Sequence, residues 1–325
     1  MYAFPHDVAY LSTTKLGFIN LPGLLSHGKR DRTARVPGFV AIQLGERCFL
    51  VFLREGEPFH AARVEPSSRG PEAISAVLRT ASRESERGEG GQIAYYGASE
   101  EQLLAMLATL LNEPVELEGV DDPRQPEQLF PALRERRFSG VLELSDGGQI
   151  HYLCFEEGRY RSAFLATTGA EAPAKEVVRT LFETGRDSLR LALYPPCAEL
   201  PMQAVPGLVD LYRRVIGGVM NELGGVMGGE AGGAVMRAAQ SACAVHAPVI
   251  AEFVLSAEGR VHGDPVASPR ELTRAVAAWV TEALVRAAEQ AALDPAATLA
   301  RITRDARFVL EEHDFFLHLP WTVSF

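Results

Sequence analysis

The chain has 325 residues, of which 47% are hydrophobic and 23% charged, and its formal net charge is −10 at pH 7. This composition is typical of globular proteins and excludes a globally disordered chain. The acidic balance disfavours a general nucleic-acid binder, because such proteins usually present a basic face.

No targeting segment, membrane span or cysteine-based metal motif stands out in the chain. The N-terminus lacks the basic start and apolar core of a signal peptide, and no apolar run approaches the roughly 20 residues that a membrane span needs. The cysteines show no CxxC pair or zinc-like spacing. The basic segment from His27 to Arg35 is interrupted by Gly28 and Asp31, so we interpret it as a solvated loop. We expect a cytoplasmic protein without a membrane span.

An internal repeat occupies the first 200 residues. The segment Gly38–Ala61 aligns without a gap over Gly140–Ala163, at an offset of 102 residues. Identical positions include Gly38 with Gly140, Glu55 with Glu157, Gly56 with Gly158, and Ala61 with Ala163. The similarity continues downstream, where Arg79-Thr80 falls on Arg179-Thr180. A pattern shared over about sixty residues is stronger evidence for a repeat than any single motif.

Each copy predicts three strands, a helix and a closing strand. In the second copy, "VLELS" alternates polar and apolar residues, which predicts a strand with one buried face. Asp146–Gly148 predicts a tight turn, and so do the turns that contain Gly56 and Gly158, because glycine adopts positive φ at little cost. The repeating apolar residues from Val177 to Phe182 predict a helix. We therefore expect two antiparallel-sheet-plus-helix modules, at residues 1–120 and 121–200.

Residues from about 124 to 200 resemble the bacterial PATAN domain. The resemblance rests on the leading helix in "PEQLFPALRERR", the strand pattern that begins at Ser139-Gly140, and the turn from Gly158 to Ala163. The first copy departs from this pattern, because Pro37-Gly38 stands where the second has Ser139-Gly140. Membership of this family implies a signalling or adaptor module, often found with receiver domains, and it supplies no known catalytic residues.

A glycine-rich segment follows a linker, Tyr194–Pro206, that holds four prolines. Its glycine pairs begin at Gly217, Gly224, Gly228 and Gly232, at helical spacings that place them on one face. Such a face predicts a close helix–helix seam, within a bundle or across a dimer. A break is expected at Gly228-Gly229. The segment has neither of the glycine motifs of nucleotide-binding loops, which disfavours a phosphate site.

The rest of the region 207–325 is predicted to be mainly helical. Ser268, Pro269 and Glu271 form a capping box before an apolar stripe from Leu272 to Ala287. Asp294 caps a second helix, whose stripe is predicted to comprise Leu299, Ile302, Ala306, Val309 and Leu310. Residues 248–263 predict a strand, a turn and a strand. The expected fold class is therefore α+β, with two repeated modules followed by a helical domain.

Four residues are candidates for chemistry. Cys243 and His246 lie three residues apart, where a helix would place them on one face as a reactive thiol requires. His246, His262 and His313 are candidate metal ligands, but no two of them have the helical spacing that presents two imidazoles to one ion. We favour structural roles for all four residues. The sequence thus predicts no catalytic residue, cofactor or metal site.

Three hypotheses for function follow. The first is a non-enzymatic bacterial signalling adaptor that binds a receiver domain or a small Ras-like GTPase, with C-terminal helices that form a homodimer or bind a second partner. The second is a sensor with a small-molecule cavity in the C-terminal helical domain. The third is a metal-dependent hydrolase that uses His246, His262 and His313.

Overall fold

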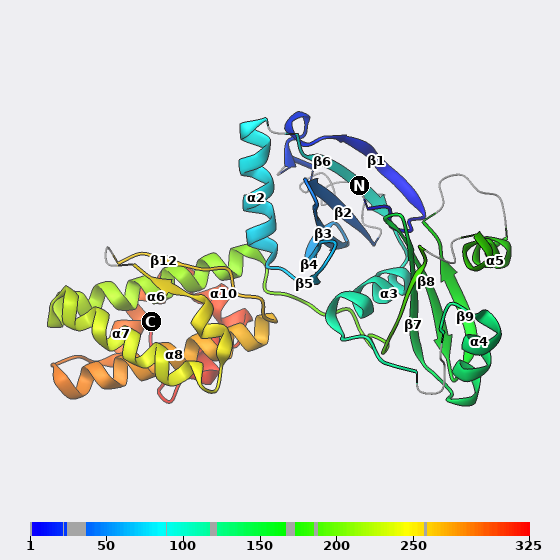
Figure 1. The fold of residues 1–325 in the computed structure, drawn as a ribbon. Coiled ribbons are helices and arrows are strands. Elements are labelled where there is room, and N and C mark those ends of the chain that lie inside the picture. Colours follow the sequence, from blue (N-terminus) through cyan, green and yellow to red (C-terminus); the bar gives the residue numbers. More distant parts are fainter. Residues whose placement is uncertain are drawn as a thin grey trace. The chain divides into compact units, whose positions relative to one another are not determined.

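The chain forms two compact units in the computed structural model (Figure 1). One comprises Met1–Glu72 and Val77–Pro201, and the other Ala73–Ala76 and Met202–Phe325. The structure describes residues 2–21, 23–24, 37–88, 90–117, 122–166, 173–184, 188–256 and 259–325. The basic segment His27–Arg35 lies outside the described residues. The α+β fold class is confirmed, with antiparallel sheets in the N-terminal unit and mainly helices in the C-terminal unit.

The N-terminal unit contains two antiparallel sheets with the orders β1-β6-β2-β3-β4-β5 and β10-β7-β8-β9. The elements of the first sheet and its helices are β1 (Val8–Lys15), η1 (Leu16–Phe18), β2 (Gly38–Leu44), β3 (Arg47–Arg54), β4 (Glu57–Val64), β5 (Arg69–Pro71), α2 (Ile74–Arg87), β6 (Gln92–Gly97) and α3 (Glu100–Leu111). Those of the second are α4 (Pro126–Glu135), β7 (Gly140–Asp146), β8 (Gln149–Glu156), β9 (Arg159–Phe164), α5 (Ala174–Thr184) and β10 (Arg190–Tyr194).

The repeated modules are confirmed by this topology. The order β10-β7-β8-β9 of the second module reproduces β6-β2-β3-β4 of the first, and β7 and β8 have the same lengths and relative positions as β2 and β3. Even the irregularity is shared, since the pairing of the second strand with the third shifts between Phe52 and Leu53 and again between Cys154 and Phe155. A bulge at the same place in both copies is a built feature of the module.

The turns after the second strands are also alike. Glu55 and Gly56 have φ of 52° and 77°, and Glu157 and Gly158 have φ of 48° and 75°. Two consecutive positive φ values match the right-handed twist of the flanking strands. Glycine is required at position 158 for a second reason besides its positive φ. A Cβ there would lie 2.6 Å from the Cα of Arg134 in α4.

The prediction of a single buried face for β7 is wrong. Val141 and Glu143, on the face expected to meet solvent, are 4% and 3% exposed. The reason is α3, which is buried on most of its circumference and packs in one core with residues of both sheets, including Phe52 and Tyr152. The opposite face of the second sheet meets α4 and α5 in a separate core. The two repeats therefore share a core instead of standing apart.

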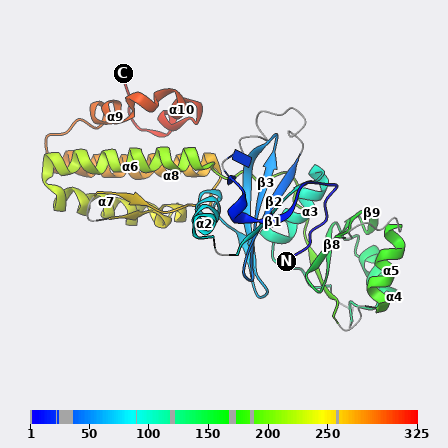
Figure 2. The ribbon, with the colours of Figure 1, turned by 90° about the horizontal axis from the view of Figure 1, so that it is seen from above.

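The C-terminal unit is a helical bundle in which α6, α7 and α8 lie side by side (Figure 2). Its elements are α6 (Pro206–Met227), α7 (Gly229–Ala244), η3 (Pro248–Glu252), β11 (Val254–Leu255), β12 (Val261–His262), α8 (Pro269–Gln290), α9 (Pro295–Thr303), η4 (Arg304–Ala306), α10 (Arg307–Glu312) and η5 (Phe315–His318). Ser268 and Asp294 cap α8 and α9 through their side chains, as their sequence context predicts.

The predicted helix with a stripe from Leu299 to Leu310 is interrupted. The short segment η4 separates α9 from α10, so that Leu299 and Leu310 both face the core while Val309 is 45% exposed. Among the described residues, none of the helices has the combination of length and apolar character required to span a membrane.

Candidate protein-interaction site

The glycine seam forms between α6 and α7, which are joined at Gly228 with a φ of 89°. A Cβ on Gly232 would lie 2.7 Å from the backbone N of Gly224 and 2.8 Å from the carbonyl carbon of Leu223. The two helix backbones are therefore in direct contact at this point. Gly217 has a different environment, near Val261 and Gly259. The four glycines thus do not share one role.

The structure does not bring the candidate chemical residues together into a site. Burial, and then the charge of Glu282, raise the pKa of the Cys243 thiol, which opposes formation of a thiolate. His246 and His262 are exposed, and His313 is half-buried just after α10. Within the described part of the chain, no three histidine, cysteine or acidic side chains are grouped so that they could hold a metal ion.

An ion pair between a partly exposed arginine and a buried glutamate joins the two sheets of the N-terminal unit. Arg69 of β5 donates two hydrogen bonds to the Glu143 carboxylate, at 2.6 and 2.9 Å, and its guanidinium lies 5.5 Å from the ring centre of Tyr194. Burial alone would lower the pKa of Arg69, but the hydrogen bond and charge of Glu143 raise it. Burial, followed by the charge of Glu143, raises the pKa of Tyr152 well above its usual value. With its carboxylate paired with Arg69 in this way, Glu143 has a structural role.

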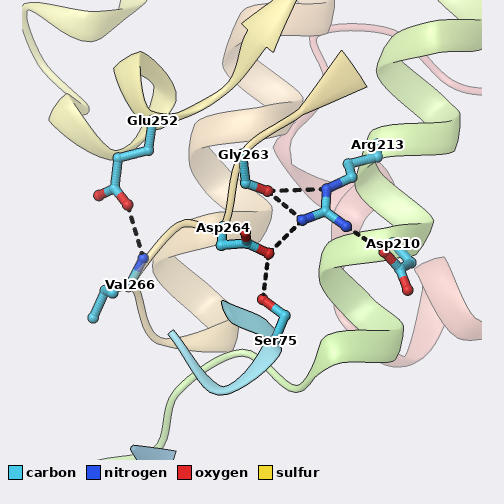
Figure 3. Close-up of polar contacts among 7 residues, drawn as sticks. All are labelled: Ser75, Asp210, Arg213, Glu252, Gly263, Asp264 and Val266. Atoms are coloured by element: carbon cyan, nitrogen blue, oxygen red, sulfur yellow. Dashed lines mark hydrogen bonds and ion pairs between the residues drawn. The ribbon is translucent and has the colours of Figure 1, made fainter. Parts of the chain in front are cut away.

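A second polar cluster belongs to the C-terminal unit (Figure 3). Arg213 of α6 donates to the carbonyl oxygen of Gly263 at 3.0 Å, and its ion pairs with Asp264 and Asp210 measure 2.6 and 2.5 Å. The Ser75 hydroxyl donates to the same Asp264 oxygen at 2.7 Å. The cluster fixes the end of the β11–β12 hairpin and the segment Ala73–Ala76 to α6. Mutual pairing of its charges again indicates a structural role.

An exposed aromatic surface lies near the C-terminus. We define it by Arg307, Phe308 and Phe325. The Arg307 guanidinium lies 5.8 Å from the ring centre of Phe308 and 4.8 Å from that of Phe325. Phe308 is 81% exposed and Phe325 is 42% exposed. Aromatic residues and arginine are enriched in protein–protein interfaces, and such a contiguous exposed group marks a candidate docking surface.

Contacts with the core hold this surface in place. The Phe325 ring lies 5.3 Å from that of Phe316, which in turn lies 5.5 Å from that of Phe315. Phe315 is fully buried in the core of the C-terminal unit. Arg307 is further positioned by Glu311, at 2.7 Å. A positioned aromatic surface loses less conformational entropy on binding than a mobile one.

The sequence contained a signal for this surface that our prediction did not use. Phe308 falls outside the apolar stripe that includes Leu310, and two residues along a helix correspond to roughly 200° of rotation. A phenylalanine at that position faces away from the core. No comparable signal marks Arg69 and Glu143, which are 74 residues apart in the chain.

Comparisons with protein-family models, with curated proteins and with solved structures find no match for this chain.

Proposed function

We propose that this chain is a non-enzymatic signalling adaptor of the cytoplasm that docks a partner protein on the aromatic surface Arg307–Phe308–Phe325. The observation that carries the proposal is the 81% exposure of Phe308 beside an arginine that contacts two aromatic rings. Leaving a large apolar side chain in water forgoes about 1.5–3 kcal/mol of burial free energy, which a partner recovers on binding.

The internal repeat supports the same proposal. The resemblance of the second module to the PATAN domain suggests a signalling context, and we propose that the first module is a divergent member of that family. A receiver domain or a small Ras-like GTPase is the partner class that we favour. Fold-level analogy is a weaker argument than the surface itself, so the experiment addresses the surface first.

The test compares Phe308→Ser with Phe18→Ser in the full-length chain. Phe18 is 77% exposed and lies in the N-terminal unit, so it serves as a matched control for the loss of an exposed phenylalanine. Binding of purified receiver domains and Ras-like GTPases from the same organism is measured by calorimetry. We expect Phe308→Ser to weaken binding at least tenfold and Phe18→Ser to leave it unchanged.

Equal affinities for both variants would contradict the proposal. The alternative occupant of the aromatic surface is a second copy of the chain, which light scattering would detect as a dimer. A dimer that dissociates only in Phe308→Ser would replace the partner protein with a homodimer.

A further inference from the structure

His151 is a buried histidine whose two ring nitrogens have different environments. It lies on β8, is 0% exposed, and pairs across the sheet with Leu144. Because alternate residues of a strand share a face, His151 lies on the same face as Leu153, within the core formed with α4 and α5. This core is apolar, so a charge on the imidazole would be poorly solvated there.

The hydrogen bonds assign the tautomer. Nδ1 of His151 accepts the backbone N–H of Ala166 at 3.1 Å, so Nδ1 carries a lone pair and the proton of the neutral ring is on Nε2. Nε2 is buried and has no hydrogen-bond partner among the residues that the structure describes. The contact continues the attachment of β9 to β8, because the last strand pair is Tyr152 with Phe164. Ala166 is itself 5% exposed.

Protonation cannot be accommodated in this arrangement. An imidazolium is a donor at both nitrogens, so Nδ1 would face the N–H of Ala166 with a proton of its own. The Ala166 N–H would lose its acceptor, and the charge would remain in an apolar core. Both consequences favour a state in which Ala166 separates from His151.

The surrounding charges do not offset this cost. The charged residues of the elements that cover or adjoin this face are Asp146 on β7, Arg159 and Arg161 on β9, Arg190 on β10, Glu127, Arg134 and Glu135 on α4, and Lys175, Glu176, Arg179 and Glu183 on α5. Those on α4 and α5 are exposed. Burial lowers the pKa of His151, and Asp146 opposes the effect without reversing it.

We propose that His151 is a proton-sensitive latch that holds Ala166, two residues after β9, against β8 and releases it on acidification. The neutral ring stabilises the closed state, and this stabilisation is present above the ordinary histidine pKa of about 6.5. It is lost as the pH falls through and below that value, because the open state then binds a proton that the closed state does not.

The first test uses the wild-type chain and requires no variant. Ring-nitrogen NMR at pH 7.5 should show His151 with its proton on Nε2. Amide hydrogen exchange of Ala166, corrected for the intrinsic pH dependence, should lose protection by about tenfold per pH unit below 6.5. A proton on Nδ1 or a pH-independent Ala166 would each overturn the proposal.

Two variants separate the latch from general acid sensitivity. His151→Gln retains an oxygen that can accept the Ala166 N–H but does not titrate, so protection of Ala166 should persist and become independent of pH. His60→Gln removes another buried histidine of this unit, which is 4% exposed, and should leave the response of Ala166 unchanged. An Ala166 response that disappears in His60→Gln would assign the effect to His60 and refute the latch.

Discussion

Replacing Gly232 by alanine should destabilise the C-terminal unit although alanine is the better helix former. The added Cβ would lie 2.7 Å from the N of Gly224, 2.8 Å from the carbonyl carbon of Leu223 and 3.1 Å from the Cα of Gly224. All three atoms are backbone, so α6 and α7 must move apart. Overpacking of this kind costs about 1–3 kcal/mol, and contacts below 3.0 Å place it near the upper end. Alanine recovers about 1 kcal/mol of helix propensity, which leaves a net loss of about 2 kcal/mol.

Gly225→Ala is the matched control, since it makes the same chemical change in the same helical hairpin. Gly225 lies within α6, is exposed, and a Cβ there would meet no atom within 4 Å. Only the propensity gain remains, so this variant should be more stable than the wild type by about 0.5–1 kcal/mol. The two variants therefore differ in the sign of their effect, which no general property of glycine replacement explains.

Tryptophan fluorescence during urea unfolding is a suitable assay for both variants. The two tryptophans of the chain, Trp279 and Trp321, both belong to the C-terminal unit. Trp279 also donates a hydrogen bond to the carbonyl oxygen of Met236 in α7 at 3.0 Å, so its environment depends on the position of that helix. If Gly232→Ala proved as stable as Gly225→Ala, the close contact of α6 with α7 would be refuted.

Two further predictions concern charge and pH. Arg213→Ala should lower the free energy of unfolding of the C-terminal unit by about 2 kcal/mol, because the largely buried Asp264 carboxylate, 15% exposed, loses a cationic partner. Arg301→Ala breaks an ion pair whose arginine is 61% exposed, so the free energy of unfolding measured by the same fluorescence assay should not change. Equal losses in the two variants would refute the conclusion that the Arg213 ion pair stabilises the protein more than the Arg301 ion pair. Burial lowers the pKa of His60 to about 4, so the N-terminal unit should lose up to about 3 kcal/mol of stability between pH 6.5 and 4, as measured by urea unfolding followed by circular dichroism. His60→Gln should reduce this slope, and an N-terminal unit that gains stability on acidification would contradict the reasoning.

Features that depend on a few neighbouring residues could be predicted from the sequence. The repeat, the glycine turns and the caps at Ser268 and Asp294 all follow from local backbone chemistry, because a turn or a cap is formed within about four residues. The break at Gly228 belongs to the same class, since its φ of 89° is one that glycine adopts readily. These features specify the strands and most of the helices, and hence the α+β class.

Tertiary structure decided which faces of those elements meet. Alternation in β7 predicts solvent beside Glu143, but α3 and Arg69 cover that side chain from distant parts of the chain. The glycine spacing predicts a seam without identifying Gly232 as its tightest point, because the opposing backbone at Leu223 and Gly224 is placed only when the hairpin closes. Helical period alone could show that Phe308 points away from Leu310. Whether anything covers it depends on long-range packing, which no local pattern encodes.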